Sequence, residues 1–463
     1  MNNPPFSGQL PSSFRDPSGF LFQRDGSLLR QVNYLYKEHY DQLKSSGLYN
    51  ELVSSGLLIP HNEVDIQHAA SDQAYKVIRP DLIPFISYPY EWCFSQLKDA
   101  ALTTIEIQKK AFEFGMSLKD CSAYNIQFRN ARPIFIDTLS FEKYREGEPW
   151  IAYRQFCQHF LAPLALMSYR DIRLSQLLRI YIDGVPLDLV SSLLPFKTRL
   201  SFSLLSHIHL HARSQSRYAD KPIGVRKKKM GKLGFRGLID SLETTVRKLK
   251  WKTQFTEWAD YYEDTNYSPG AFQHKKDLVA EFLDNVRPKT VWDLGGNIGV
   301  FSRIASDRGI QTICFDIDPG AVEKHYQDCS QDGEAPILPL VLDLTNPSPG
   351  TGWQNDERLS LQKRGPADMI FALALIHHLA ISNNLPFERI AEFFSQICSY
   401  MIIEFVSKND SQVQRLLASR EDIFKDYNQQ TFEAVFKNYF SIESSARIVD
   451  SDRTFYLMRR KGD

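Results

Sequence analysis

The sequence has few cysteines: six among 463 residues, with no C-x-x-C pair. This scatter argues against a disulfide framework and against a cysteine-ligated zinc site. No uncharged apolar run approaches the roughly 18–20 residues that a membrane-spanning helix needs. The polar, proline-rich start lacks the basic-then-apolar order of a secretory signal. We therefore expect no membrane span and a cytoplasmic protein.

The sequence also lacks a net charge, since Lys plus Arg and Asp plus Glu both number 55. A neutral chain has no overall field that attracts nucleic acid or an anionic membrane, so a nucleic-acid partner is not favoured. A chain of this length exceeds one hydrophobic core, and we expect two domains, at residues 1–212 and 256–463. Basic runs at 226–229 and 247–252 mark the segment between the two domains, 213–255, as a basic linker. These runs are compatible with a solvated connector or with an RNA-binding surface.

The two predicted domains differ in their pattern of strands and helices. The N-terminal half mixes short strands with helices, which predicts an α+β domain. We expect a hairpin at 19–32, two extended runs broken by prolines at 75–92, a helix at 93–114, a second hairpin at 125–136 and helices over 153–205.

From Lys289 onward, strands and helices alternate, as in a parallel sheet with crossover helices. The predicted strands are 290–294, 311–315, 337–342, 368–374 and 401–405. A helix and two final strands follow between 432 and 459, which favours an antiparallel pair that closes the sheet.

The strongest local signal is an apolar strand that runs into a glycine turn, V-W-D-L-G-G-N-I-G-V-F-S at 291–302. Gly295, Gly296 and Gly299 let the backbone pass close to a ligand, which we expect beyond the carboxyl ends of the strands. The acid Asp293 before the glycines indicates which ligand. A carboxylate suits S-adenosylmethionine, which has a cationic amine and sulfonium and no phosphate, whereas it would repel a pyrophosphate.

Acids also end the next two predicted strands. Asp316 is placed to accept hydrogen bonds from both ribose hydroxyls, and Asp343 to accept one from the adenine amino group. Acids at the ends of three successive strands are more specific than one, although aspartate is also a common cap and turn residue.

These residues resemble the motifs of class I S-adenosylmethionine-dependent methyltransferases, and the resemblance covers residues 258–460. It implies a Rossmann-like α/β domain with a mostly parallel seven-stranded sheet, and S-adenosylmethionine as the cofactor. It places the glycine turn, with Asn297 and Gly299, around the methionine part of the cofactor. Asp316 then lies at the ribose and Asp343 beside the adenine.

Methyl transfer needs an acceptor held close and aligned, with a base when the acceptor is a hydroxyl. Strand four is followed by L-I-H-H-L, so His377 or His378 is a candidate general base, and either ring is equally compatible with packing the crevice. Glu404 at the end of strand five, and Asn384 and Glu388 just after the histidines, are further candidates on the acceptor side, and each is equally compatible with a cap. An aromatic segment at 258–267, which ends in Tyr267, is compatible with folding over the cofactor or with packing the linker onto the sheet.

The segment L-K-D-C-S-A-Y-N-I-Q-F, followed by P-I-F-I-D-T, resembles the catalytic loop and metal-binding aspartate of kinase-like folds. By that resemblance Asp120 accepts a hydroxyl proton, and Asn125 and Asp137 are weak candidates for metal ligands. Because no G-x-G-x-x-G loop and no V-A-I-K lysine precede them, we expect a degenerate module that recognises substrate or nucleotide. An active kinase stays an alternative. We expect no zinc at the H-x-H-x-H of 207–211, because the preceding leucines favour a helix, where this spacing scatters the rings.

The whole chain resembles bacterial nodulation-protein-like two-domain methyltransferases, through its segments 88–92, 118–141 and 373–379. We therefore predict an enzyme that methylates a small-molecule or glycan acceptor, with O-methylation favoured and the N-terminal domain selecting the acceptor. The alternatives are an RNA methyltransferase, a bifunctional kinase and methyltransferase, and a non-catalytic S-adenosylmethionine sensor. The sequence does not indicate an oligomeric state.

Overall fold

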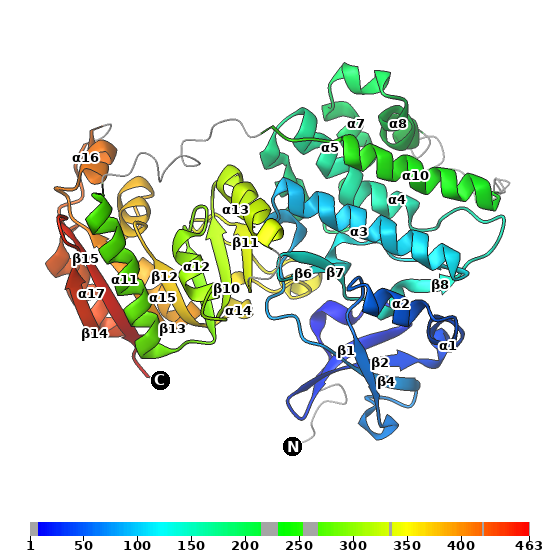
Figure 1. The fold of residues 1–463 in the computed structure, drawn as a ribbon, viewed down its shortest axis with the longest axis horizontal. Coiled ribbons are helices and arrows are strands. Elements are labelled where there is room, and N and C mark those ends of the chain that lie inside the picture. Colours follow the sequence, from blue (N-terminus) through cyan, green and yellow to red (C-terminus); the bar gives the residue numbers. More distant parts are fainter. Residues whose placement is uncertain (1–7, 214–229, 253–266, 333–335, 419–420, 463) are drawn as a thin grey trace. The chain divides into compact units, whose positions relative to one another are not determined.

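The protein was analysed as a computed structural model, which describes residues 8–213, 230–252, 267–332, 336–418 and 421–462. The chain forms two compact units (Figure 1). The first contains Met1–Lys252 together with Gly350–Arg358, and the second contains Thr253–Pro349 together with Leu359–Asp463. Each unit is described by itself below.

The first unit begins with a four-stranded antiparallel sheet in the order β1-β2-β4-β3. Its strands are β1 (Gly19–Arg24), β2 (Ser27–Asn33), β3 (His61–Val64) and β4 (Ala74–Pro80), and the helices between β2 and β3 are α1 (Lys37–Ser45) and α2 (Leu48–Ser54). The predicted N-terminal hairpin is confirmed. Its turn, Asp25-Gly26, has positive φ at both residues, which matches the right-handed twist of a hairpin. Of the two extended runs predicted at 75–92, only the first is a strand.

Helices make up the rest of the first unit, with two small strand pairs among them. The predicted long helix is α3 (Phe94–Glu113), and it stops before Gly115, which has φ +72°. The second predicted hairpin is β6 (Ile126–Arg129) with β7 (Arg132–Phe135), and β5 (Met116–Leu118) pairs with β8 (Phe141–Lys143). The predicted helical set is α4 (Tyr153–Phe156), α5 (Ala162–Tyr169), α6 (Leu177–Ile180), α7 (Leu187–Leu193) and α8 (Phe202–Leu204), with π-helical turns at Cys157–Leu161 and Leu205–Leu210.

Part of the predicted basic linker is instead a helix of the first unit. Helix α10 (Lys232–Lys248) packs against α3, where the rings of Phe235 and Phe112 stack at 4.8 Å. Lys109 of α3 forms ion pairs with two acids of α10. Apolar residues recur at three and four positions along α10, but its glycines and flanking basic runs obscured that pattern in the sequence. The basic run at 226–229 lies outside the described residues.

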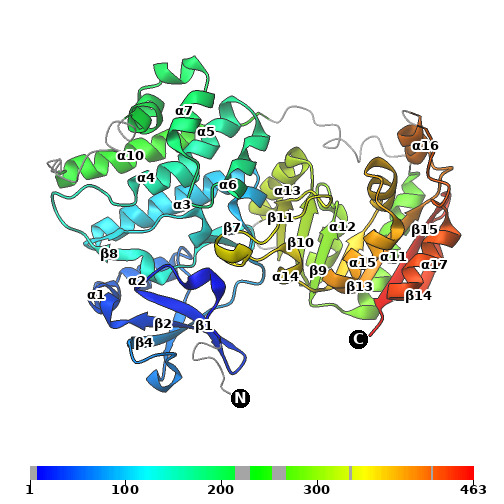
Figure 2. The ribbon, with the colours of Figure 1, turned by 180° about the vertical axis from the view of Figure 1, so that it is seen from behind.

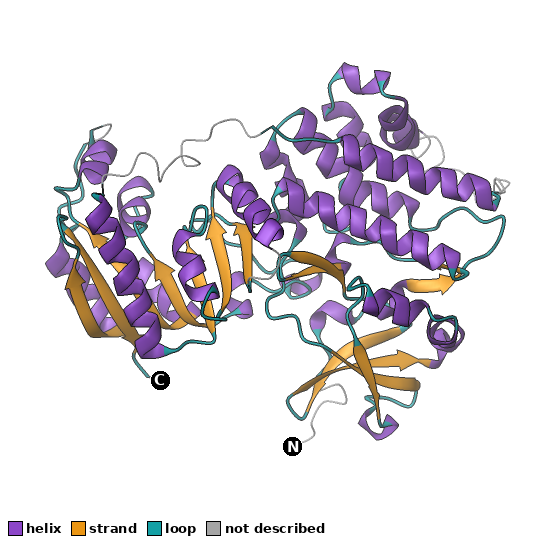
Figure 3. Cartoon of the chain, in the orientation of Figure 1, coloured by secondary structure: helices purple, strands orange, loops and turns teal. Residues whose placement is uncertain are grey.

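The second unit is built on the predicted seven-stranded sheet, in the order β11-β10-β9-β12-β13-β15-β14 (Figure 3). Its strands are β9 (Thr290–Leu294), β10 (Gln311–Asp316), β11 (Ile337–Val341), β12 (Ala367–Ala372), β13 (Cys398–Val406), β14 (Phe440–Arg447) and β15 (Arg453–Arg460). The first five are parallel, and β15 and β14 are antiparallel at one end. The predictions of a mostly parallel sheet and of its closing antiparallel pair are confirmed.

Helices cover both faces of this sheet. Helices α11 (Pro269–Val286) and α12 (Val300–Ser306) lie on one face (Figure 1), and α15 (Phe387–Ile397) and α17 (Gln429–Tyr439) on the other (Figure 2). The remaining helices are α13 (Pro319–Asp332), α14 (Leu361–Arg364) and α16 (Ser411–Leu417). A core of apolar side chains from α11, α12 and the central strands holds one face in place. In the part of the chain that the structure describes, no helix is both long and apolar enough to span a membrane.

Candidate cofactor pocket

A pocket of about 230 Å³ opens at the carboxyl ends of β9, β10 and β12. Strand β9 lies between β10 and β12, and the chain continues from it to β10 on one side and later to β12 on the other. Open α/β sheets bind ligands where the strand order reverses in this way. The residues that line the pocket are Tyr267, Phe272, Lys275, Asp293, Gly295, Gly296, Asn297, Phe301, Asp316, Ile317, Leu373, Ala374, Leu375, His378, Ser382 and Asn383.

The glycine turn after β9 forms one wall of the pocket. Gly295, Asn297 and Gly299 all have positive φ, between 51° and 80°, so the turn needs residues that tolerate the left-handed region. Gly296 has no room for a side chain, because a Cβ there would lie 2.4 Å from the Cys314 sulfur. These conformations keep the backbone, and no side chain, at this wall.

Asp293, at the end of β9, is buried beside this turn. Its Oδ2 accepts a hydrogen bond from the Ser302 hydroxyl at 2.6 Å, and the residue is only 2% exposed. Burial raises the pKa of the Asp293 carboxyl to about 6, and the nearby charge of Asp316 adds to the shift. Desolvation disfavours the charged form of an acid, so this carboxylate gains from a cation placed next to it.

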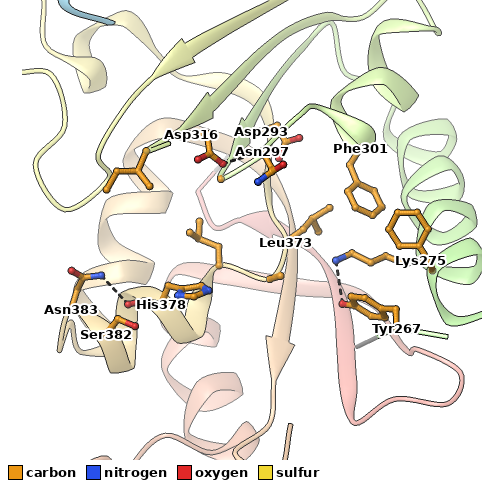
Figure 4. Close-up of a pocket in the computed structure, with 16 residues that line it drawn as sticks. Tyr267, Lys275, Asp293, Asn297, Phe301, Asp316, Leu373, His378, Ser382 and Asn383 are labelled. Atoms are coloured by element: carbon orange, nitrogen blue, oxygen red, sulfur yellow. Dashed lines mark hydrogen bonds between the residues drawn. The ribbon is translucent and has the colours of Figure 1, made fainter. Parts of the chain in front are cut away.

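Asp316 ends β10 and faces the same pocket (Figure 4). Its Oδ2 accepts the backbone N–H of Asn297 at 2.8 Å, and its Oδ1 accepts that of Asp318 at 2.8 Å. Burial also raises the pKa of Asp316 to about 6, although these two hydrogen bonds oppose the shift. These hydrogen bonds hold the carboxylate in place. Because a carboxylate oxygen has more than one lone pair, Asp316 can still accept hydrogen bonds from a ligand.

Another side of the pocket carries a buried positive charge (Figure 4). The Lys275 ammonium, on α11, lies 2.7 Å from Glu404 Oε2 and 3.2 Å from the Tyr267 hydroxyl. Burial lowers the pKa of Lys275, and the contact with Glu404 opposes that shift. The Tyr267 hydroxyl also donates to Glu404 and lies 2.5 Å from Arg453 Nη1.

Glu404 is the centre of this network and is fully buried. Burial alone raises its pKa, but the charges of Lys275 and Arg453 outweigh that effect and hold the pKa at about 2. The same Oε2 accepts the backbone N–H of Ala374 at 2.7 Å. Ala374 has φ +48° and lines the pocket, so Glu404 fixes the loop after β12 in a strained conformation. Glu404 therefore anchors this loop, and it is not among the residues that line the pocket.

The two candidate bases differ in their access to the pocket. His378 lines it beside Ser382 and Asn383 (Figure 4), and burial lowers the pKa of His378 to about 4. A neutral imidazole at physiological pH is able to accept a proton. His377 is 2% exposed and does not line the pocket, and burial lowers its pKa well below the ordinary value. Of the two histidines, only His378 lines the pocket.

The structure brings most of the predicted cofactor residues together and leaves out two. Gly299 lies behind the pocket wall, where a Cβ would lie 2.0 Å from the His325 ring. Asp343 does not line the pocket, and its Oδ1 accepts hydrogen bonds from the N–H and hydroxyl of Thr345. The predicted adenine contact of Asp343 thus has no support in the geometry, because its carboxylate forms a local turn.

Sequence reasoning missed Lys275, although the sequence contains a signal for it. The buried face of α11 has Ala271, Lys275, Leu278, Val279 and Phe282 at helical spacing. A lysine in an apolar stripe is rarely buried unless an acid pairs with it. Its position in the apolar stripe alone therefore indicated that Lys275 is buried and paired with an acid.

The kinase-like residues of the first unit also lie close together. Asn125 Nδ2 donates to the Ser140 hydroxyl at 3.3 Å, and that hydroxyl donates to Asp137 Oδ2 at 2.6 Å. The charge of Asp137 contributes to raising the pKa of Asp120, after the larger effect of burial. The three side chains therefore form one cluster.

Two of the three histidines at 207–211 contact hydroxyl groups through both ring nitrogens. His207 contacts the hydroxyls of Tyr153 and Ser241, through Nδ1 at 2.8 Å and Nε2 at 2.9 Å. His209 likewise contacts two hydroxyls through its two ring nitrogens. The segment is helical, and among the described residues no group of three or more His, Cys, Asp or Glu side chains is arranged to hold a metal.

Comparison with known proteins gave no matching family model. Several solved methyltransferase structures resemble part of the chain. The N-methyltransferase NodS from Bradyrhizobium japonicum is 11% identical, over 42% of this chain and 98% of its own, with a TM-score of 0.31. Magnesium protoporphyrin IX methyltransferase from Synechocystis is 17% identical, over 43% of this chain and 90% of its own, with a TM-score of 0.31. The bifunctional kinase-methyltransferase WbdD is 15% identical, over 40% of this chain and 39% of its own, with a TM-score of 0.29.

One curated relative matches the chain along nearly its whole length. The nodulation protein NoeA of Rhizobium meliloti is 35% identical over 464 residues, which cover 98% of this chain and 97% of that protein. Identity at this level across both units shows common descent of the whole two-unit chain. The protein belongs to the family of the nodulation protein NoeA.

Proposed function

We propose that the second unit is an S-adenosylmethionine-dependent methyltransferase that acts on a hydroxyl of a small-molecule or glycan acceptor. The observation that carries this proposal is the pair of buried carboxylates, Asp293 and Asp316, at the pocket. Both have pKa values raised to about 6, so a cationic ligand relieves an unfavourable charge that burial creates.

The donor set of the pocket fits this cofactor better than a dinucleotide. A pyrophosphate next to two buried carboxylates would be repelled, whereas a sulfonium and an ammonium would be attracted. The rigidly held Asp316 suits a ribose, since a carboxylate is able to accept hydrogen bonds from two neighbouring hydroxyls. The backbone at the glycine turn leaves the close approach that such a ligand requires.

The charge at the other side of the pocket orients the ligand. Lys275 lines the pocket and is able to attract the carboxylate of a methionine group, and the Tyr267 hydroxyl beside it is a second donor. The pocket is thus acidic at Asp293 and Asp316 and basic at Lys275. A ligand with a carboxylate at one end and a ribose at the other fits in one direction only.

His378 is our candidate for the base that takes the acceptor proton. The bound cofactor would supply a methyl group on a sulfonium. His378 is neutral near pH 7 and, of the two histidines, it is the one that lines the pocket, which supports this role. We further propose that the first unit selects the acceptor, because the family relationship covers both units together.

The first test is calorimetric titration of the full-length protein with S-adenosylmethionine. We expect saturable binding that the Asp316→Ala variant loses, and that the Asp307→Ala variant keeps. Asp307 is a matched control, because it is an exposed aspartate at the end of α12 in the same unit. Absence of binding to the intact protein would refute the assignment.

A second step separates an enzyme from a sensor. The protein is incubated with methyl-labelled S-adenosylmethionine and fractionated cell-surface glycans or small molecules, and label transfer is compared with that of the His378→Ala variant. Transfer that depends on His378 supports catalysis. Binding with no transfer to any fraction would favour a sensor.

A further inference from the structure

The N-terminal unit contains a cluster of acidic and amide side chains, Asp120, Asn125 and Asp137, at the site of its kinase resemblance. That resemblance implies magnesium held by Asn125 and Asp137. Magnesium needs oxygen ligands with open lone pairs in near-octahedral geometry. Whether the implied metal fits depends on what already contacts these oxygens.

The Asp137 carboxylate already has three partners within the protein itself. Arg30 Nη1, on β2, lies 2.6 Å from Asp137 Oδ1, which also accepts the Leu139 N–H at 3.0 Å. Oδ2 accepts the Ser140 hydroxyl at 2.6 Å. Three donors therefore converge on the two oxygens, and one of them is a full positive charge.

The ion pair between Arg30 and Asp137 is shielded from water. The Arg30 side chain is 9% exposed and that of Asp137 is 14% exposed. Burial by itself raises the pKa of Asp137, but the Arg30 charge and the hydrogen bonds outweigh it, and the pKa lies below its ordinary value. Asp137 is thus already paired with a cation, Arg30, and the solvent screens the attraction between the two charges only weakly.

The neighbouring candidates are occupied as well. Asp120 Oδ1 accepts the Gln155 amide at 2.7 Å and the Ser122 N–H at 2.9 Å. Asn125 donates its amide nitrogen to Ser140. With the Arg30 guanidinium 2.6 Å from Asp137 Oδ1, the cluster already contains a cation, and the implied magnesium does not fit beside that positive charge.

We propose that Arg30 is a built-in cation that replaces the metal of this kinase-like cluster, so that the N-terminal unit works without a divalent cation and as a binding module. The hairpin of β1 and β2 is then tied to the Asp137 turn by a permanent charge and not by a metal that exchanges. This inference is independent of methyl transfer by the second unit.

The test is Mn²⁺ binding to the full-length protein, followed by electron paramagnetic resonance. We expect no Mn²⁺ site in the wild type that depends on Asp137. Arg30→Met leaves the Asp137 charge without its cation, so it should gain an Mn²⁺ site that binds at least about tenfold more tightly than any residual Mn²⁺ binding of the wild type, or about 1.4 kcal/mol. The double variant Arg30→Met with Asp137→Asn should lose that site again.

Arg24→Met is the matched control, because Arg24 is an exposed arginine on the same hairpin. It should leave Mn²⁺ binding at the wild-type level. Mn²⁺ bound by the wild type and lost in Asp137→Asn would overturn the proposal, as would a folded Arg30→Met protein that gains no site. Circular dichroism checks the fold of each variant, and the wild-type titration decides the question if Arg30→Met does not fold.

Discussion

The two buried carboxylates of the second unit predict how cofactor affinity depends on pH. Their pKa values of about 6 belong to the ligand-free protein. A cationic ligand favours the ionised forms, so affinity is full above about pH 7 and falls as the pH drops through 6. At about pH 5 each carboxylate costs a factor of about 10 in affinity, because protonation is favoured there by one pKa unit. Since Asp293 and Asp316 interact and titrate together, the combined loss should lie between about 10-fold and about 100-fold.

Calorimetry of S-adenosylmethionine binding between about pH 5 and pH 7 measures this dependence, with buffers of different ionisation enthalpy to count the released protons. The Asp293→Asn variant should bind more weakly at neutral pH and should show a flatter profile, because one titrating group is gone. Circular dichroism at each pH confirms that the protein stays folded. An affinity that is constant over this range in folded protein would refute the electrostatic argument for the pocket.

Three further substitutions test the site and the fold. His378→Ala should lower the rate of methyl transfer by about 100-fold to 10,000-fold while changing cofactor affinity far less, because its ring acts on the acceptor; labelled-methyl assays and calorimetry separate the two. Gly299→Ala should lower the free energy of unfolding in urea melts by more than the roughly 1–3 kcal/mol that a strained backbone alone costs. The reason is that φ is +80° and the added Cβ would also lie 2.0 Å from a histidine ring. Gly309→Ala, at φ +74° with open space around it, shows the backbone cost alone, and equal losses would argue against the clash. Phe235→Ala should cost about 3–5 kcal/mol if α10 is packed and not a linker. The exposed Leu233→Ala should cost under about 0.5 kcal/mol.

The sheet of the second unit was predictable because its signals are local. Each strand is a short apolar run, and each is followed by a turn residue or a helix pattern. The position of the site was also predictable, because the carboxyl ends of parallel strands meet at one edge of the sheet and bring Asp293 and Asp316 together. Asp343 shows the limit of this reasoning. An acid after a strand is equally suited to close a turn, and here its oxygen accepts two donors from Thr345.

Ion pairs between residues far apart in the chain could not be predicted from the sequence. Glu404 looked like an acceptor-side residue, since nothing local shows that Lys275 and Arg453 converge on it. These partners come from α11 and β15, which the fold brings to the end of β13. Helix α10 was missed for a related reason, because its partner α3 lies far back in the sequence and its own residues include breakers and basic runs.

The two acid clusters of this chain show why a motif alone does not decide whether a cation binds. In the second unit Asp293 and Asp316 are buried without a neutralising contact at hydrogen-bond distance, and their pKa values rise to about 6. In the first unit the Asp137 side chain is 14% exposed, Arg30 forms an ion pair with it, and its pKa lies below the ordinary value. The pKa of the same residue type therefore shifts in opposite directions in the two units. Ionised Asp293 and Asp316 would be stabilised by a cationic ligand, such as a sulfonium. Asp137 already has a cationic partner, Arg30 of β2. Under our proposal, Arg30 on that strand, and not the Asp and Asn spacing, decides whether the cluster holds a metal.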